Sequence, residues 1–473
     1  MTGISASTTR ESAQDGRVSA QDGRGPEAVR MEPAVRPPVP LHRNLRFQLL
    51  WGGAASSTLG LQVSDTAYPL LLLAMTGSST LAGAFGALQI AASVLFGVHG
   101  GAVADRCDRR RVLIVADSVR LSAALSVPLA MALDLFTVAH ALLSAVVIGA
   151  TLAYSGPVRL LAVRSVVPPE QLRQALAQDE ARMSGAGLAG PPLAGLLLGA
   201  GRAVPFLGAA LASLLSLATA CLVRFPAGAA ARGGAGAGAD PSTSTDTGTG
   251  TGTDQTRPAA PAREADPAAG GETERGGALA GFRYLLADRT LRATLAVVFG
   301  INLVGSAVVL PVIVLLRERG ASSGGIGVAL AGEAVGAIVG ALLVSRLHRL
   351  TGPGSLLLAV AWCVVPLFLL PLLPGGAVTV FGALFLMGLG VPALRVMIDI
   401  LVFQQVAEEL RGRVIAATMT LFTVGMPAGL FGSGVLLDQV SPATALVALA
   451  ALLALGLLPA TFDRTLRRAD WPA

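Results

Sequence analysis

The sequence is poor in charge and contains no lysine. Only 14% of its 473 residues are charged, about half the share typical of soluble domains, whereas 53% are hydrophobic. A soluble core does not need so much apolar surface, but a lipid bilayer does. All 35 basic residues are arginine, and many fall in short stretches between apolar runs. The composition therefore indicates a membrane protein and argues against a nucleic-acid-binding face.

Cysteine is also scarce, and the motifs of several enzyme classes are missing. The three cysteines, Cys107, Cys221 and Cys363, have no CxxC spacing, so neither a disulfide framework nor a zinc site is expected. The sequence has no GxxxxGK[ST] loop, which excludes nucleotide hydrolysis by the chain itself. It also lacks the clustered His, Cys or carboxylate residues of an intramembrane enzyme. We expect a protein that is not an enzyme and holds no metal or other cofactor.

Two segments lack the apolar residues needed for a core. Residues 1–40 have no apolar h-region and are rich in Arg, Gln, Asp, Glu and Pro, so we expect a disordered cytoplasmic tail and not a signal peptide. Residues 226–277 consist mostly of Gly, Ala, Thr, Pro, Asp and Arg and cannot offset the entropy of ordering them. We expect a flexible cytoplasmic linker there, between halves at 41–225 and 278–465, and a short cytoplasmic tail at 466–473.

The sequence does contain many apolar segments of about 20 residues, long enough to cross the hydrocarbon core of a bilayer. Six are predicted before the linker and six after it. They lie near 47–73, 79–104, 112–133, 138–160, 183–203, 204–224, 292–316, 323–346, 354–373, 377–400, 414–436 and 441–461. The predicted fold is an all-α membrane protein with twelve transmembrane helices in two six-helix halves.

The distribution of arginine predicts the orientation of these helices. With the N-terminus inside, the predicted outer loops hold only Arg202, Arg317 and Arg319. Cytoplasmic loops of membrane proteins carry an excess of basic residues. The protein is therefore predicted to lie in the inner membrane with both termini and the linker in the cytoplasm. The arginines of the inner loops and C-terminal tail are Arg106, Arg109, Arg110, Arg111, Arg164, Arg173, Arg182, Arg346, Arg349, Arg411, Arg413, Arg464, Arg467 and Arg468.

The two halves resemble copies of each other. Arg-Asn-Leu-Arg at 43–46 resembles Arg-Thr-Leu-Arg at 289–292, and Glu-Gln-Leu-Arg at 170–173 resembles Glu-Glu-Leu-Arg at 408–411. Each match is short, but the matches keep the same order and a similar separation. Parallel repeats of six helices, related by an axis along the membrane normal, are a known plan of secondary transporters.

The loop after the second predicted helix contains a Gly, three residues, an Asp and then a basic cluster. It resembles the signature of the major facilitator superfamily at the same helix 2–3 junction, although Asp108 replaces the Gly that usually precedes the basic pair. The resemblance implies a gate in which this loop contacts the positively polarised N-terminus of helix 11 and closes the cytoplasmic side. The alternative is an ordinary positive-inside loop. The matching residues are Gly101, Asp105, Arg106, Arg109 and Arg110.

The amino-acid sequence at 49–51, 67–70 and 117–120 resembles the drug-and-siderophore exporter branch of that superfamily, which includes macrolide-efflux and enterobactin-exporter-like proteins. The fifth predicted helix resembles the Gly-Pro motif of family exporters, in which prolines bend the helix and glycines allow tight packing. The resemblance implies export. The alternative is that Gly and Pro are simply frequent in membrane helices. The residues of this motif are Gly187, Gly190, Pro191 and Gly195.

Few ionisable residues fall inside the predicted helices, where a charge costs about 2.5–3.5 kcal/mol. Glu333 is the first candidate for proton coupling, because it lies near the middle of its helix with no Arg within one turn; Asp65 is the second. A structural hydrogen bond is an equally good reading of each. Arg120 follows Asp117 by three residues, so the pair either neutralises itself or leaves Arg120 to bind an anionic or carbonyl group.

A central cavity between the halves is predicted to be lined by Arg120, Tyr154, Asn302 and Phe299, although aromatic residues at helical spacing more often serve packing. These features together predict a monomeric secondary transporter in the lipid bilayer with no nucleic-acid partner. It would export a small amphipathic molecule, such as a drug, an antibiotic or a siderophore-like compound, by alternating access in exchange for protons. An importer or a non-transporting sensor of the same fold is the alternative.

Overall fold

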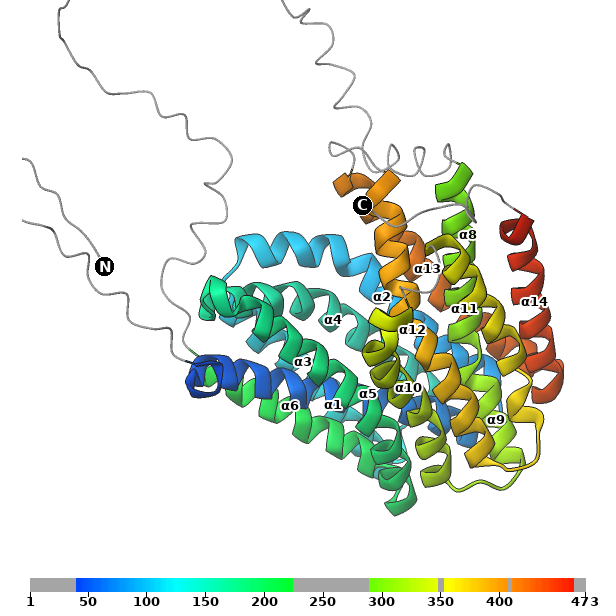
Figure 1. The fold of residues 1–473 in the computed structure, drawn as a ribbon. Coiled ribbons are helices and arrows are strands. Elements are labelled where there is room, and N and C mark those ends of the chain that lie inside the picture. The colour runs from blue at the N-terminus through cyan, green and yellow to red at the C-terminus, as the bar shows by residue number, and fades with distance from the viewer. Residues whose placement is uncertain (1–39, 224–288, 348–352, 406–410, 463–473) are drawn as a thin grey trace, which may run out of the picture. The chain divides into compact units, whose positions relative to one another are not determined.

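The computed structural model describes residues 40–223, 289–347, 353–405 and 411–462, nearly all of them in helices, and no strand occurs within these ranges (Figure 1). The predicted tails and linker lie outside the described residues. The N-terminal half contains α1 (Leu45–Thr76), α2 (Ser79–Arg106), α3 (Arg109–Ala132), α4 (Val138–Val166), α5 (Leu172–Ala200) and α6 (Val204–Leu222). The C-terminal half contains α8 (Arg289–Ala307), α9 (Val309–Glu318), α10 (Ser323–Leu347), α11 (Pro353–Leu367), α12 (Ala377–Gln405), α13 (Arg411–Leu437) and α14 (Pro442–Phe462).

The predicted all-α fold with two six-helix halves is confirmed. Helices α8 and α9 are separated only by Val308 and form one crossing, which leaves six crossings in each half. Ten segments in the described ranges are long and apolar enough to span a bilayer. Helix α1 is not among them although it has 32 residues, because Gln62, Ser64 and Asp65 interrupt its apolar sequence.

Short-range sequence signals set the helix ends. Asn44 begins α1, since its side-chain oxygen accepts a hydrogen bond from the amide of Phe47 at 3.2 Å. Gly77 ends α1 in the left-handed conformation, with φ 67°. Asp108 begins α3 by accepting from the amide of Arg110 at 2.8 Å, and it takes the place of the glycine that the superfamily signature usually has here. The loop therefore makes its turn with a capping carboxylate.

Glycine seams hold the helices together within the C-terminal half. Gly332, Gly336 and Gly340 recur every four residues on α10, and a side chain at any of them would collide with a backbone carbonyl of α12. Small residues at this spacing let two backbones approach closely, which replaces the hydrophobic driving force that lipid does not supply. The same principle joins α2 to α4, where Gly100 and Gly149 meet carbonyls of the partner helix.

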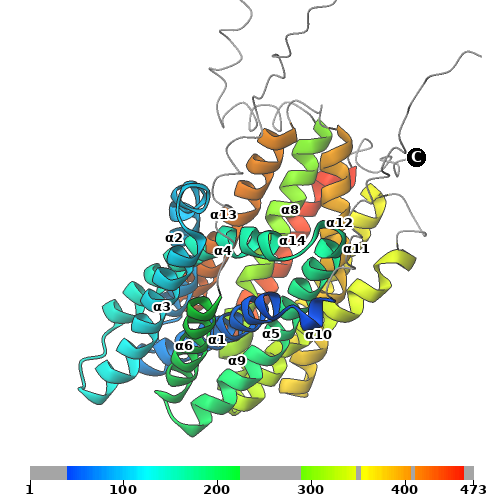
Figure 2. The same ribbon diagram turned by 90° about the vertical axis from the view of Figure 1, so that its left-hand side faces the viewer.

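The two halves contact each other mainly through two helix pairs, α2 with α13 and α5 with α10, with a smaller contact between α2 and α9 (Figures 1 and 2). Gly83 and Gly434 sit where α2 and α13 touch, and Gly195 and Gly327 sit where α5 and α10 touch. All four lie toward the end of the bundle where α2 begins and α13 ends, which we call the Asp438 end. We call the opposite end, where α2 ends and α3 begins, the Arg106 end.

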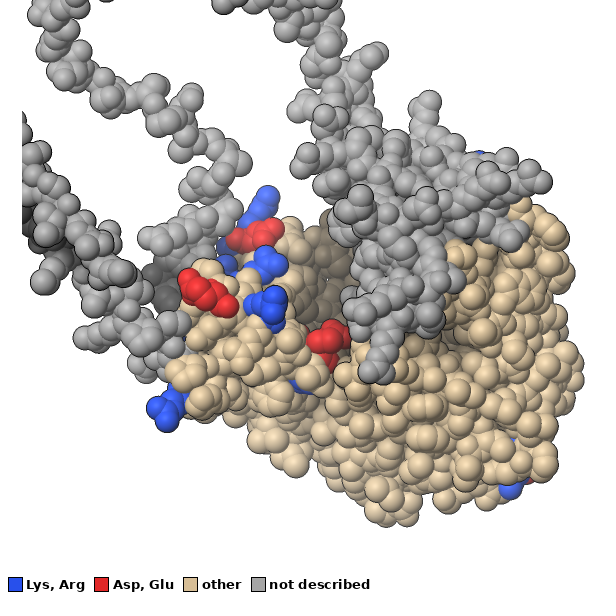
Figure 3. All heavy atoms as spheres, viewed as in Figure 1, with Lys and Arg blue, Asp and Glu red and all other residues tan. Residues whose placement is uncertain are grey.

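Charged side chains gather at the Arg106 end of the N-terminal half, and most of the remaining visible surface is uncharged (Figure 3). This pattern suits helices that are surrounded by lipid along their length and meet water at their ends. The exposed charged residues at this end include Arg43, Arg46, Asp105, Arg106, Asp108, Arg111, Arg164, Glu170 and Arg173.

Candidate functional site

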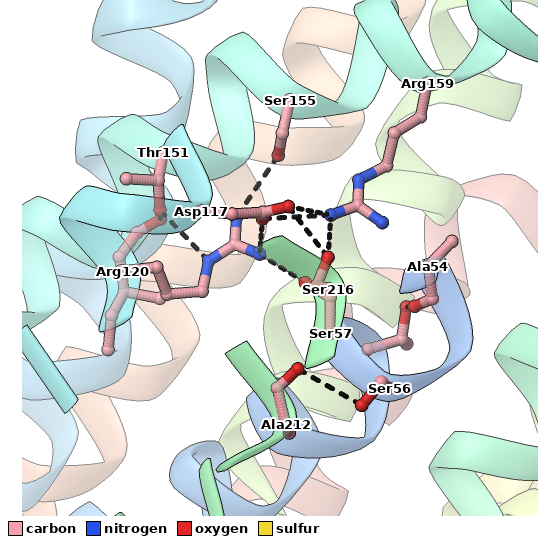
Figure 4. A network of polar contacts seen from close by, with 12 residues as sticks. Ala54, Ser56, Ser57, Asp117, Arg120, Thr151, Ser155, Arg159, Ala212 and Ser216 are labelled. Carbon is pink, nitrogen blue, oxygen red and sulfur yellow. Dashed lines mark hydrogen bonds and ion pairs between the residues drawn. The ribbon is translucent and has the colours of Figure 1, made fainter. Parts of the chain in front are cut away.

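A buried ionic network lies inside the N-terminal half, centred on Asp117 of α3 (Figure 4). Its carboxylate, 1% exposed, accepts from Arg159 of α4 at 3.0 and 3.3 Å and from the hydroxyl of Ser216 of α6 at 2.7 Å. The guanidinium of Arg120 lies 3.4 Å away on its other side. One carboxylate thus serves two guanidinium groups, and each ion has the close partner that a charge away from water requires.

Arg120 is fully engaged by its neighbours. Apart from Asp117, it donates to Ser57 of α1 and to two α4 hydroxyls, Thr151 at 3.3 Å and Ser155 at 3.2 Å. Its side chain is buried among α1, α4 and its own helix, α3. The sequence reading of a self-neutralising Asp117–Arg120 pair describes part of this arrangement, because the closer partner of Asp117 is Arg159.

A cavity of about 270 Å³ adjoins this network between α1, α3, α4, α5 and α6. Two arginines, Arg159 and Arg182, and two carboxylates, Asp117 and Asp179, contribute to its lining. Arg182 forms an ion pair with Asp179 at 2.8 Å and donates to the carbonyl of Ala54 at 3.0 Å and to the hydroxyl of Thr58. The rest of the wall is largely apolar and includes Phe47, Leu50, Trp51, Leu160, Leu176 and Met183.

Sequence reasoning missed Arg159. The fourth helix was predicted to end at residue 160, which would put Arg159 at the membrane boundary with the other loop arginines. Helix α4 instead continues to Val166, so Arg159 lies seven residues inside it. The continuous apolar run after Arg159, ending at Arg164, was the available signal.

The two candidate proton-coupling residues lie in different halves and have different surroundings. Asp65 of α1 is partly buried, and its carboxylate accepts a hydrogen bond from the side-chain amide of Gln89 of α2 at 2.9 Å. Glu333 of α10 is exposed, and none of the described residues forms a hydrogen bond or ion pair with its carboxylate. Asp65 therefore has a structural partner among the described residues, and the roles of both carboxylates in proton coupling stay predictions.

The Gly-Pro motif of α5 lies at helix contacts. A side chain at Gly190 would collide with Gln62 of α1, and one at Gly195 would collide with the carbonyl of Ser323 of α10. The carbonyl of Pro191 lies against Gly327 of α10, and Gly187 faces Gln62 and Ala334. The motif thus joins the N-terminal half to the C-terminal half, and its predicted role in export stays a prediction.

The gating motif is divided between a structural part and an exposed part. Arg109 donates to the carbonyl of Leu161 in α4, and Arg110 donates to that of Cys221 at the end of α6. Arginine near a helix C-terminus is favoured by the helix dipole, so Arg110 stabilises the N-terminal half itself. Asp105 and Arg106 are exposed, and none of the described residues of other helices lies within 4 Å of the position that a side chain at Gly101 would take. The side chains at the start of α13, the predicted partner, lie outside the described residues.

The remaining predicted cavity residues are dispersed. Tyr154 lies in a groove of about 690 Å³ between α2, α3 and α4, where its hydroxyl is 2.8 Å from Nδ1 of His99. Asn302 donates to the carbonyl of Val298 on its own helix at 2.9 Å, and Phe299 packs near Gly425 of α13. The structure does not bring these residues together with Arg120.

At the Asp438 end, the carboxylate of Asp438 joins the two halves. It accepts from the amides of Ser79 at 2.7 Å and Thr80 at 3.2 Å and from the hydroxyl of Ser78 at 3.0 Å, at the start of α2. Partial burial opposes its charge, but hydrogen bonds from Thr80, Ser79 and Ser78 outweigh that effect and hold the pKa of Asp438 below its ordinary value. We call this contact the Asp438 clasp.

Comparison with known families identifies the family of the chain. A family model described as "Transmembrane secretion effector" matches residues 37–231 and 256–470. The chain belongs to this family of the major facilitator superfamily. No curated protein matches the sequence. As a member of this family the chain is a multi-pass membrane transporter and not an enzyme.

Solved structures show the same fold at low identity. The nucleoside transporter NupG matches with a TM-score of 0.64 and 13% identity over 88% of this chain and 98% of that chain. An inward-facing, occupied bacterial homolog of the human lysosomal transporter Spinster matches with 0.61 and 14%, over 92% and 100%. A D-xylose–proton symporter matches with 0.59 and 13%, over 89% and 97%. These likenesses support the fold of this secretion effector family member and leave its cargo open.

Proposed function

We propose that the protein is a monomeric secondary active transporter that exports a small amphipathic molecule by alternating access, in exchange for protons. The Arg106 end is assigned to the cytoplasm and the Asp438 end to the outer side of the inner membrane. This orientation rests on arginine. Among the described residues, the loops of the Asp438 end carry only Arg202, Arg317 and Arg319, whereas the Arg106 end carries Arg43, Arg46, Arg106, Arg109, Arg110, Arg111, Arg164 and Arg173.

The observation that carries the proposal is the difference between the two ends. The halves are joined at the Asp438 end by the clasp and by the glycine contacts of α2 and α5. At the Arg106 end, no described residue of another helix lies within 4 Å of the position that a side chain at Gly101 would take. With this end in the cytoplasm, the conformation is one in which an exporter collects its cargo, and export requires the clasp to open while the Arg106 end closes.

Glu333 is assigned the proton. A carboxylate inside a membrane helix is expensive unless it meets water or a partner, and Glu333 is exposed without a partner among the described residues. Proton binding from the acidic outer side and release to the cytoplasm would couple an inward proton gradient to outward transport. The D-xylose–proton symporter shows that this fold can couple to protons in another protein.

Inverted membrane vesicles, in which the cytoplasmic face is outside, test the proposal. A panel of labelled drugs and siderophore-like compounds should yield at least one that accumulates when the vesicle interior is acidified. Glu333→Gln should abolish this uphill accumulation and retain exchange down a concentration gradient, because the amide keeps the shape but cannot titrate. Asp65→Asn is the matched control and should pump normally.

Four results would count against the proposal. Normal pumping by Glu333→Gln together with failure of Asp65→Asn would move the proton site to α1. Normal pumping by both variants would remove these carboxylates from coupling. Accumulation only in right-side-out vesicles would make the protein an importer, and the absence of any transported compound would favour a sensor.

A further inference from the structure

We propose that the 270 Å³ cavity beside Arg159, the Arg159 cavity, binds an organic monoanion: an amphipathic molecule with one acid group. This inference rests on the proposed function, because it names the chemical class of the exported molecule. The carrying observation is that Arg159, which lines an otherwise largely apolar cavity, has hydrogen-bond donors that no described residue uses.

The three arginines around Asp117 differ in how many of their nitrogens are engaged. All three side-chain nitrogens of Arg120 donate to protein groups. All three of Arg182 also have partners, in Asp179, Ala54 and Thr58. Among the described residues, Arg159 has partners only for Nη2, which donates to Asp117 and Ser216. The other amino nitrogen points away from the network in Figure 4.

The unused donors of Arg159 are accessible from the cavity. Its side chain is 20% exposed, compared with 7% for Arg120 and 8% for Arg182, and it lines the cavity wall. A guanidinium has five N–H donors, and in Arg159 those on Nε and Nη1 are unused whereas Nη2 donates to Asp117 and Ser216. A bound carboxylate would therefore accept a charge-assisted hydrogen bond from Nη1 or Nε while leaving the bond of Nη2 to Asp117 in place.

The charges that line the cavity balance, because Arg159 and Arg182 are matched by Asp117 and Asp179. Arg120 and Asp65, which attract each other outside the lining, also balance. The preference for an anion therefore rests on the unused donors of Arg159. A cation cannot accept hydrogen bonds from them, and a neutral molecule accepts weaker ones than an anion does.

The walls fit an apolar body of modest size attached to that acid group. Phe47, Leu50 and Trp51 of α1 line the cavity together with Leu160 of α4 and Met183 of α5. The indole N–H of Trp51 donates to the carbonyl of Gln178 at 3.1 Å, which leaves the ring to line the cavity. Pockets that bind small molecules are mostly apolar with a few placed polar groups, and this volume lies near the small end of their range.

The Arg159 cavity has an exposed rim. Gly156, Leu160, Leu176 and Met183 are exposed residues of α4 and α5 that contribute to its lining. Nothing lies within 4 Å of the position that a side chain at Gly156 would take. Gly156 therefore offers a way to fill the opening without changing any ion of the network.

Trp51 provides a direct readout of occupancy. Replacement of the other two tryptophans, Trp362→Phe and Trp471→Phe, leaves Trp51 as the single indole of the full-length protein. The probe is 4-(4-bromophenyl)butyrate, whose bromine quenches indole fluorescence by contact. Its neutral comparison is the corresponding primary amide, and its cationic comparison is 4-(4-bromophenyl)butylamine. The butyrate should quench Trp51 with a Kd at least about tenfold lower than that of either comparison, because a charge-assisted hydrogen bond is about twice as strong as a neutral one.

Two matched variants separate the cavity from non-specific uptake into detergent or lipid. Gly156→Phe should raise the Kd of the butyrate at least about tenfold by filling the cavity. Gly97→Phe, on α2 and outside the cavity, also starts from a glycine with open space around it and should leave the Kd within about twofold. Arg159→Gln should remove the preference for acid over amide; if it does not fold, Gly156→Phe decides the question.

Equal binding of acid and amide, or equal effects of Gly156→Phe and Gly97→Phe, would overturn the inference. Both measurements use purified protein without a gradient, so they do not depend on transport. Failure of binding with intact proton-driven export in vesicles would reject the monoanion and keep the transporter. Binding without any export would reject the proposed function and keep the site.

Discussion

Replacement of Asp438 by Asn should loosen the Asp438 clasp while leaving each half folded. The carboxylate accepts three hydrogen bonds at the start of α2, two of them from backbone amides that have no partner inside the helix. An amide keeps one acceptor oxygen but loses the charge that the helix N-terminus favours. Asp438 is exposed, so solvent screens the interaction and we expect a cost of about 1 kcal/mol.

That cost corresponds to about a fivefold shift in the ratio of closed to open conformations at this end. Spin labels at Arg202 and Val378, which lie at the Asp438 end of the two halves, can report it as a longer distance in double electron–electron resonance. The labels require a background without Cys107, Cys221 and Cys363. Asp134→Asn is the control, since it neutralises another exposed carboxylate at the same end.

The clasp should also respond to acid. Because its pKa is lowered in the clasped state relative to the ordinary value of about 3.9, the carboxylate stabilises that state at any pH above the ordinary pKa. The stabilisation is lost as the pH falls through the lowered pKa. Label distances in the unaltered protein should therefore be constant from about pH 5 to 8 and lengthen below about pH 4, and Asp438→Asn should lack this response. Opening that grows between pH 8 and 6, or an acid response retained in the Asn variant, would refute the reasoning.

Three further predictions follow from the fold. Asp117→Asn should lower the free energy of unfolding by about 3–5 kcal/mol, since it leaves buried arginine unpaired, whereas Asp179→Asn should cost about 0–1 kcal/mol; comparable losses in a thermal unfolding assay would contradict the network. Gly195→Ala should weaken the contact of α5 with α10 and increase label distances between them, while Gly199→Ala, which has open space, should not. Reporter tags at both termini and within 226–277 should all be inaccessible from outside intact cells.

The fold was accessible from the sequence because lipid imposes simple constraints on length and composition. Apolar runs of about 20 residues, separated by arginine-rich loops, identify the helices without knowledge of their neighbours. The pairing of Asp117 with Arg120 was also accessible from the sequence, because the two residues lie three apart on one helix. Helix boundaries are harder to predict. The fourth helix was predicted to end near residue 160, but α4 continues to Val166, and this difference concealed Arg159.

The site depends on which helix faces meet, and the sequence carries little information about that. Helices that are apolar all around have no polar face to mark the side turned inward. Tyr154 was therefore predicted for the central cavity but lies with His99 in the groove of α2, α3 and α4. Asp438 was missed because its partners, Ser78 to Thr80, are more than 350 residues away in the chain.

The most direct test of the central claim, export by alternating access, is to lock the Asp438 end shut. Ser78→Cys with Asp438→Cys replaces two side chains that now contact each other, in a background without the native cysteines. Oxidation to a disulfide should stop proton-driven accumulation in inverted vesicles, and reduction should restore it. Accumulation that continues at the full rate with the disulfide formed would contradict the account.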